Sequence, residues 1–290
     1  MNHNRFDYSP LVQRKPFRLP GDARVAVWVI PNIEHFHIAR PSTSITTATA
    51  GLVPDILNYS WRDYGVRVGV WRMMEIMDKY SVKGTAALNS EVCGHYPQII
   101  EAGMQLGWEW MGHGQTNSRF IANMKEDEER QVIRDVIETI QRATGQRPKG
   151  WLSPALTETF HTPDLLAEEG IEYVANWVND DQPYPMNVRK NSLYSIPYSI
   201  EINDIPAFLD IGMTGEQFYQ MIVDQFDVLY EDGEASARVM SICLHPFLIG
   251  QPHRSKYFDR ALKYITSRKE VWIATGWEII SHYKQTCQPL

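Results

Sequence analysis

Short apolar runs of strand length alternate along this chain with longer segments of helical periodicity. The first run, residues 24–30, is almost continuously apolar, which is typical of a parallel strand covered on both faces. Seven or eight such strands alternating with helices predict an α/β fold, a distorted or incomplete (β/α) barrel. The later strands are predicted at residues 85–88, 108–111, 149–152, 173–176, 193–196, 239–244 and 271–273.

Apolar side chains at helical spacing predict helices between these strands, and two polar stretches, residues 39–59 and 177–192, are interpreted as loops. A doubly wound open sheet is the alternative, but no strand is followed by a Gly-x-Gly-x-x-Gly turn and no phosphate-binding loop occurs. We expect an N-terminal arm over residues 1–23 and one barrel domain over residues 24–290. The helices are predicted at residues 64–80, 96–106, 125–144, 162–169, 214–230, 256–267 and 276–283.

The composition restricts the class of protein. With a formal net charge of −7 and no concentrated basic segment, nucleic acid is not expected as a partner. No run approaches the roughly 20 apolar residues that span a membrane, and the first 20 residues lack a secretory apolar region. The 3 cysteines have no metal-like spacing. We therefore expect a cytoplasmic protein that does not interact with membranes.

Polar side chains follow several predicted strands at the carboxyl end, where barrels of this type place their functional groups. The segment Trp108–Asn117 shows this most clearly, because an apolar run ends in His113 between two glycines, which allow a sharp bend. A structural histidine under a loop is the alternative interpretation of His113. The other residues in such positions are Glu34, His35, Asn89, Asn117, Asn179, Asp180, Asp181 and His245.

Acid–base roles are predicted for two of these residues. Glu34 follows an apolar strand and has aromatic neighbours, so burial should raise its pKa and suit it to act as a general base. The alternative is a carboxylate paired with Arg62 or Arg67. His245, which precedes Pro246, is predicted to protonate the leaving group as a general acid.

His35 and His113 are predicted to share a divalent metal, zinc being expected, with Asn117 as the third ligand. Asn89 and Asn179 are predicted to stabilise an oxyanion. Trp177 is a further candidate for substrate contact, and so are Asp180, Asp181, His253 and Arg254. For these last four, support of the histidines, or a role as surface-loop residues or subunit contacts, is the alternative. Aromatic residues near the predicted mouth of the barrel and the loop over residues 39–59 favour a small closed pocket.

Three of these segments resemble the motifs of the NodB-type polysaccharide deacetylase family. The Asn32–His35 segment resembles the family's Thr-Phe-Asp-Asp motif, in which the first acid is the base and the second binds metal. The His113–Asn117 segment resembles its His-Ser/Thr-x-x-His motif with only the first histidine kept. Cys243–His245 resembles the late Leu-x-His motif, whose histidine is the general acid. The resemblance covers about residues 24–284 and implies a distorted barrel.

A closer resemblance is to the branch of deacetylase-like allantoinases and cyclic-imide hydrolases, through Asn-x-Glu, Gly-His-Gly and the segment that begins at Leu244. This resemblance implies a hydrolase of non-peptide carbon–nitrogen bonds that opens a small cyclic amide, imide or ureide, and a homo-oligomer, either a dimer or a tetramer. Deacetylation of an N-acetyl sugar is the first alternative. A non-catalytic small-molecule-binding relative and a lyase on the same barrel are the others.

Overall fold

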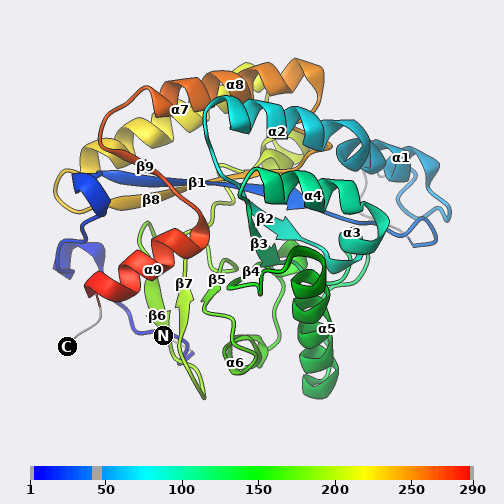
Figure 1. Cartoon of the computed structure of the whole chain (residues 1–290), viewed down its shortest axis with the longest axis horizontal. Coiled ribbons are helices and arrows are strands. Elements are labelled where there is room, and N and C mark those ends of the chain that lie inside the picture. Colours follow the sequence, from blue (N-terminus) through cyan, green and yellow to red (C-terminus); the bar gives the residue numbers. More distant parts are fainter. Residues whose placement is uncertain (1–2, 41–47, 288–290) are drawn as a thin grey trace.

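The computed structural model describes residues 3–40 and 48–287. Within these ranges nine strands form one curled sheet in the order β6-β7-β5-β4-β3-β2-β1-β8, with β9 paired to β1, and the sheet does not close between β8 and β6 (Figure 1). The predicted incomplete α/β barrel is therefore confirmed. The strands are β1 Val25–Ile33, β2 Thr85–Leu88, β3 Glu109–Gly112, β4 Gly150–Trp151, β5 Tyr173–Val174, β6 Tyr184–Met186, β7 Leu193–Ser195, β8 Arg238–Leu244 and β9 Val271–Ile273.

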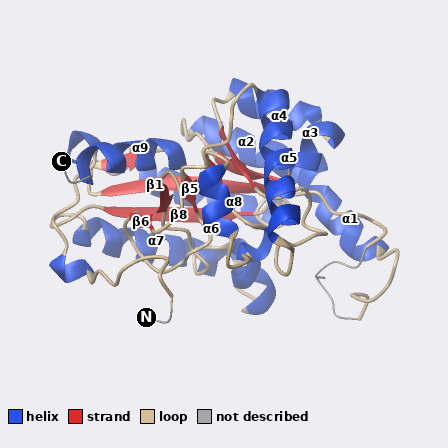
Figure 2. Cartoon of the chain, turned by 90° about the horizontal axis from the view of Figure 1, so that it is seen from below, coloured by secondary structure: helices blue, strands red, loops and turns tan. Residues whose placement is uncertain are grey.

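Alternation of side chains along β1 explains the two layers of the core. Val25, Val27 and Val29 pack with the helices that cover the convex face of the sheet, whereas Trp28 and Ile30 point into the barrel. The helices on the convex face are seen around the sheet in Figures 1 and 2. The α-helices are α1 Ile56–Tyr64, α2 Val70–Lys79, α3 Ser90–His95, α4 Pro97–Gln105, α5 Glu126–Thr144, α6 Thr162–Glu168, α7 Gly215–Asp232, α8 Pro252–Thr266 and α9 Gly276–Cys287.

The interior of the curl is filled by aromatic side chains and by helix α9. Ile279 and Ile280 of α9 belong to the same buried cluster as Trp28 and Tyr173. The ring of Tyr173 is fully buried, and its hydroxyl donates a hydrogen bond of 2.6 Å to Glu109 at the amino end of β3. This end of the barrel is therefore packed shut, which leaves the carboxyl ends of the strands for a functional site.

The N-terminal arm packs against its own chain. Phe17 lies in the interior cluster, and its carbonyl accepts a hydrogen bond of 2.9 Å from the backbone N–H of Ala237, just before β8. Arg14 forms an ion pair of 2.5 Å with Asp180. The arm therefore lies along the seam at which the sheet fails to close.

Three elements were not predicted from the sequence. Helix α1 begins within the predicted loop over residues 39–59, of which 41–47 lie outside the described residues, and continues beyond that loop to Tyr64. Asp55 caps the helix by accepting a hydrogen bond of 3.2 Å from the Asn58 N–H. Strand β6 falls within the predicted loop over residues 177–192 and pairs antiparallel with β7. Helix α3 has only 6 residues, too few to show a helical period.

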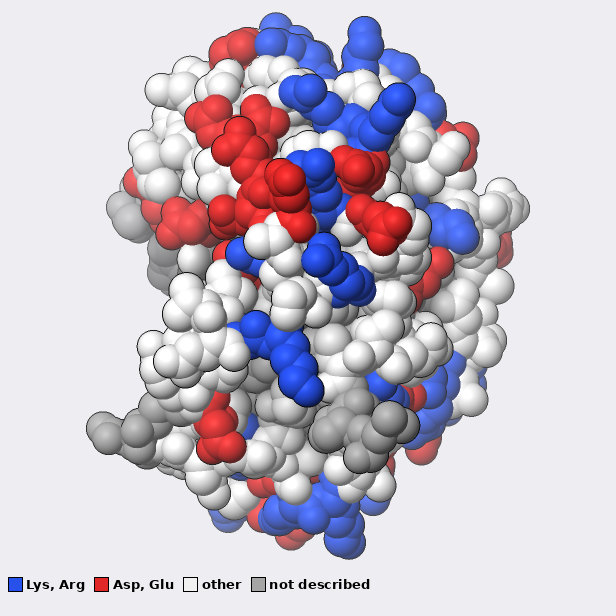
Figure 3. Space-filling model, turned by 90° about the vertical axis from the view of Figure 1, so that its left-hand side faces the viewer, with Lys and Arg blue, Asp and Glu red and all other residues white. Residues whose placement is uncertain are grey.

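The described part of the chain contains no helix that is both long enough and apolar enough to cross a bilayer. Figure 3 shows one face of the molecule, on which acidic and basic side chains are interspersed and no continuous basic surface forms.

Candidate active site

Glu34, His113 and His245 lie together at the carboxyl end of the sheet. Glu34 directly follows β1, His113 follows β3, and His245 follows β8. The Glu34 side chain is only 5% exposed, and its Oε1 atom lies 3.5 Å from His113 Nε2 and 3.6 Å from His245 Nε2. These three residues, which the sequence predicted separately, thus surround one buried point because parallel strands present their carboxyl ends at one edge.

His245 is oriented by a buried carboxylate. Its Nδ1–H donates to Asp204 Oδ1 at 2.7 Å, and its backbone N–H donates to the same carboxylate at 2.9–3.0 Å. Asp204 also accepts from the Ile249 N–H at 3.2 Å, so it fixes the loop that carries the histidine. Because Nδ1 is held in this way, Nε2 is the nitrogen that faces Glu34.

His113 presents an acceptor to Glu34. Its Nδ1–H donates to the backbone carbonyl of Leu152 at 2.7 Å, which leaves Nε2 directed at the carboxylate. Neither His113 Nε2 nor Glu34 Oε2 has a hydrogen-bond partner among the described residues, although both atoms are buried. Two buried acceptors without partners are unfavourable, so a proton, a water molecule or a cation between them would satisfy both.

The predicted rise in the pKa of Glu34 is wrong. Burial does raise the pKa of this carboxyl, but the positive charges of His245 and Arg62, together with the neighbouring His113 imidazole, outweigh burial, so the pKa lies below its ordinary value. Glu34 is therefore ionised at neutral pH. The sequence showed the apolar strand before Glu34 but not the cationic groups that other segments bring to it.

The pKa of His245 is shifted in the opposite direction. Burial lowers the pKa of the imidazole, but the carboxylates of Glu34 and Asp204 outweigh burial and raise it above its ordinary value. The site thus holds an ionised carboxylate next to a histidine that stays protonated to higher pH than usual. This is the charge arrangement that a general base and a general acid require.

A small pocket opens beside Glu34. Arg62 lines it, and its guanidinium lies 3.9 Å from the centre of the Phe36 ring. Tyr59 and Tyr96 also line the pocket, which has a volume of about 10 Å³. A cavity of this size holds about one water molecule. Of the two arginines considered as partners of Glu34, Arg62 is the one at the site, because Arg67 is 73% exposed and faces Asp63.

The predicted metal ligands do not form one donor set. His35 turns its Nδ1 to Glu91 at 2.8 Å, away from His113. Asn117 uses its oxygen to accept from Asn89 at 3.0 Å and its amide nitrogen to donate to Glu34 at 2.5 Å, so no lone pair faces the centre of the site. The residues around Glu34 therefore do not fit the predicted three-ligand metal site, and no step through a metal is derived at this point.

Asn89 has a structural role and is not available for substrate contact. Its side chain is fully buried, accepts from the His35 N–H at 2.8 Å, and donates to the carbonyl of His113 and to Asn117. It therefore ties together the two segments that carry Glu34 and His113. The oxyanion role predicted for Asn89 is excluded by this set of bonds.

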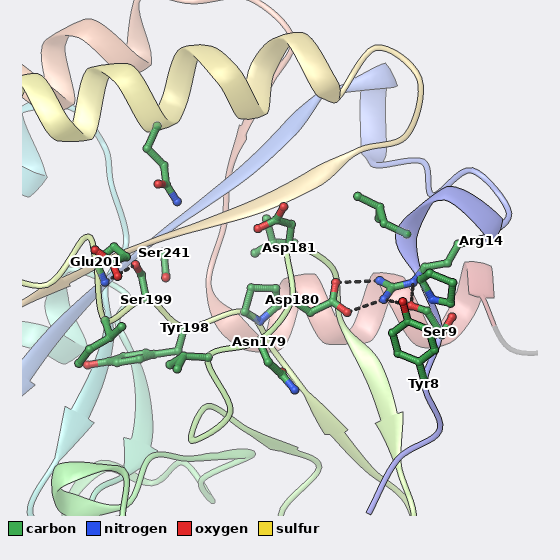
Figure 4. A pocket seen from close by; sticks show the side chains of 17 residues that line it. Tyr8, Ser9, Arg14, Asn179, Asp180, Asp181, Tyr198, Ser199, Glu201 and Ser241 are labelled. Carbon is green, nitrogen blue, oxygen red and sulfur yellow. Dashed lines mark hydrogen bonds and ion pairs between the residues drawn. The ribbon is translucent and has the colours of Figure 1, made fainter. Parts of the chain in front are cut away.

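The other predicted substrate residues lie away from Glu34. Asn179, Asp180 and Asp181 line a separate cavity of about 560 Å³ beside the arm at the open seam of the sheet (Figure 4). Asp180 is held there by Arg14, through bonds of 2.5 and 2.7 Å. Burial raises the pKa of Asp181. This cavity and the Glu34 pocket share no lining residue.

Three further candidates also contact other groups. The Trp177 ring meets Phe6 of the arm edge-on at 5.2 Å. Arg254 places its guanidinium 4.2 Å from the centre of the Phe208 ring, and burial lowers its pKa. His253 is exposed at the start of α8. None of the three lines the Glu34 pocket.

Sequence reasoning missed Asp204. Its only sequence signal is an Asn-Asp pair after the seventh strand, and nothing there shows that Asp204 faces a histidine 41 residues later. Arg62 was considered only as a pairing partner for Glu34, because it lies between the predicted loop, which ends at residue 59, and the predicted helix, which begins at residue 64.

Comparisons with known proteins find relatives of this chain by sequence and by structure. The family model "Polysaccharide deacetylase" matches residues 59–174. A protein of Schizosaccharomyces pombe named "Putative polysaccharide deacetylase" is 28% identical over 236 residues, which cover 75% of this chain and 73% of that protein.

Two crystal structures are similar over nearly the whole chain. The "probable Polysaccharide deacetylase" from Pseudomonas aeruginosa PAO1 is 30% identical with a TM-score of 0.87, and the match covers 94% of this chain and 95% of that one. Puue Allantoinase is 26% identical, also with a TM-score of 0.87, and the match covers 98% of this chain and 100% of that one.

Proposed function

We propose that this chain, which belongs to the polysaccharide deacetylase family, hydrolyses a non-peptide amide bond with Glu34 as general base and His245 as general acid. The observation that carries this proposal is the convergence of the two side chains, 3.6 Å apart and with pKa values shifted in opposite directions. A carboxylate that accepts a proton and an imidazolium that donates one are the two groups that amide hydrolysis needs.

In the proposed reaction, a water molecule in the pocket beside Glu34 gives a proton to the carboxylate as its oxygen bonds to the amide carbonyl carbon. The carbonyl oxygen becomes an oxyanion, and Arg62, which lines the same pocket, supplies positive charge to it. His245 Nε2–H then protonates the amide nitrogen, and the carbon–nitrogen bond breaks. The products are a carboxylic acid and an amine. Asp204 keeps His245 in the required orientation.

We place an N-acetyl group, carried by an amino sugar, first among the substrates. The names of the matching family and of two similar proteins support this substrate class. The second candidate is a small cyclic amide, imide or ureide. It is supported by the small volume of the pocket and by the similarity to Puue Allantoinase. Both substrates require the same acid–base step.

A substrate panel distinguishes the two candidates. The purified chain is incubated with N-acetylglucosamine oligomers and, separately, with allantoin, hydantoin and succinimide, and the Glu34→Gln variant serves as the control for contaminating activity. We expect acetate and free amine in equal amounts from the oligomers. Ring opening without acetate release would move the assignment to the cyclic substrates, and no wild-type hydrolysis of any member would contradict the proposed function.

Replacing Asp204 with Asn is expected to move the alkaline limb of the rate profile to lower pH. The Asp204 carboxylate raises the pKa of His245, and His245 must be protonated to donate, so the variant loses activity at a lower pH than wild type. The measurement is kcat/KM from pH 5 to pH 9 for both proteins. An unchanged alkaline limb would show that His245 is not the acid.

The cytoplasmic location and the homo-oligomeric state expected from the sequence remain predictions.

A further inference from the structure

A second group of titratable side chains lies next to the active site. It is formed by His35, His37, Glu91 and His95, named here the HHEH cluster. His35 Nδ1 and His37 Nε2 both approach Glu91 Oε2, at 2.8 and 2.7 Å. The rings of His35 and His95 stack with their centres 4.3 Å apart. In the part of the chain that the structure describes, His35, Glu91 and His95 are the one group of three whose ligand atoms all lie within 4.8 Å of one another.

Local geometry explains why these side chains meet. His35 and His37 are two residues apart on the segment after β1, and the side chains of both reach the same oxygen of Glu91. Glu91 and His95 are four residues apart on α3, so they lie on one face of that helix. Two pairs of donors from two different elements thus face each other.

We propose that the HHEH cluster binds one zinc ion. Three imidazole nitrogens and one carboxylate oxygen make a four-donor set of the kind that zinc takes in tetrahedral sites. Four protein ligands leave no position for substrate, so the ion would be structural. This proposal does not depend on the proposed function, because none of the four ligands performs the acid–base step.

Zinc would require His37 and His95 to move, because His37 lies outside the group of three whose ligand atoms are within 4.8 Å of one another, although its Nε2 is 2.7 Å from Glu91 Oε2. Bonds of about 2.0–2.1 Å in a tetrahedron separate neighbouring ligand atoms by about 3.4 Å. The nitrogen–oxygen distances of 2.7–2.8 Å would therefore open by about 0.6–0.7 Å. The stacked rings of His35 and His95 are 11° from parallel, so the exposed His95 must rotate about its terminal torsion, which is soft.

The backbone of the cluster is already held in place. The His35 N–H donates to Asn89 Oδ1 and the His37 N–H donates to Ser118 Oγ, each at 2.8 Å. These bonds orient the two histidines before any ion binds, which is the arrangement that favours a metal site. A bound ion would tie the segment that carries Glu34 to α3 and so keep the general base in position.

The test is zinc binding by the full chain, measured with a competing chromophoric chelator and by metal analysis after gel filtration. We expect one zinc per chain in wild type. The variants Glu91→Gln and His37→Ala should each weaken zinc binding by at least about 10-fold, the lower end of what even an indirect partner of a metal ligand contributes. His161→Ala, a change at an exposed histidine in another part of the chain, is the matched control and should keep full binding.

The His113→Ala variant distinguishes zinc binding at the HHEH cluster from zinc binding at the active site. We expect that variant to retain the zinc, because His113 is not part of the HHEH cluster. X-ray absorption of zinc-loaded wild type requires no variant to fold, and it should show three imidazole ligands and one oxygen. The proposal is overturned if wild type binds no zinc at micromolar free concentration, or if zinc is lost in His113→Ala and kept in His37→Ala.

Discussion

Replacing Glu34 with Gln is expected to lower kcat/KM for amide hydrolysis by at least about 100-fold, the effect typical of a lost general base. The amide of Gln has nearly the shape of the carboxylate and can still contact Asn117, but it cannot accept the proton of the attacking water. The measurement is kcat and KM on the best substrate of the panel, at the pH optimum of the wild-type protein.

The matched control for this change is Glu101→Gln, the same substitution at an exposed position of α4. It should leave kcat/KM unchanged. Circular dichroism of both variants shows whether they are folded. A folded Glu34→Gln protein with near-normal turnover would remove Glu34 from the mechanism.

Replacing His245 with Asn is expected to lower amide hydrolysis by a similar factor, about 10²–10⁴-fold, and to spare an activated ester. An amide nitrogen is a poor leaving group unless it is protonated, whereas 4-nitrophenolate leaves without a proton. The Asn amide can still donate to Asp204, so the buried carboxylate keeps a partner. The measurement is the ratio of kcat/KM on the amide to that on 4-nitrophenyl acetate.

The Glu34→Gln protein is the comparison for this ratio, because loss of the base should slow both substrates. Equal losses on amide and ester in His245→Asn would mean that His245 does not protonate the leaving group. A loss confined to the amide supports the assignment of His245 as the acid.

The barrel could be predicted because its signal is local. Each apolar run, such as the one from Arg24 to Ile30, can be recognised as a strand without reference to the others. The rules for connecting parallel strands then leave few possible topologies. Helix α1 was missed because Ile56 and Leu57 are exposed, so its apolar residues do not follow a core-facing period. The short β6 was missed because it contains Pro185, which argues against a strand in the sequence. Its strand conformation depends on pairing with β7.

The candidate site was predictable only in part. Strand ends placed Glu34, His113 and His245 at one edge of the sheet, as the structure has them. Which way each side chain turns depends on partners far away in sequence. His35 turned to Glu91, 56 residues further along, and this partner lies on the helix that is too short to be recognised.

The dependence on residues far away in sequence also explains why the direction of the pKa shift of Glu34 was predicted wrongly. Burial can be read from the apolar strand that precedes it, whereas the charges of His245 and Arg62 come from residues 211 and 28 positions away. The electrostatic balance of a buried group therefore requires the fold. The same balance decides the pH range in which the site works.

The pH dependence of kcat/KM for the wild-type chain tests the account most directly, because it reports the two groups in the free protein. The acid limb should lie below the ordinary glutamate pKa of 4.5, and the alkaline limb should lie above the ordinary histidine pKa of 6.5, which leaves a plateau across neutral pH. A rate that rises with pH through the neutral range and does not fall above it would contradict an ionised Glu34 acting with a protonated His245.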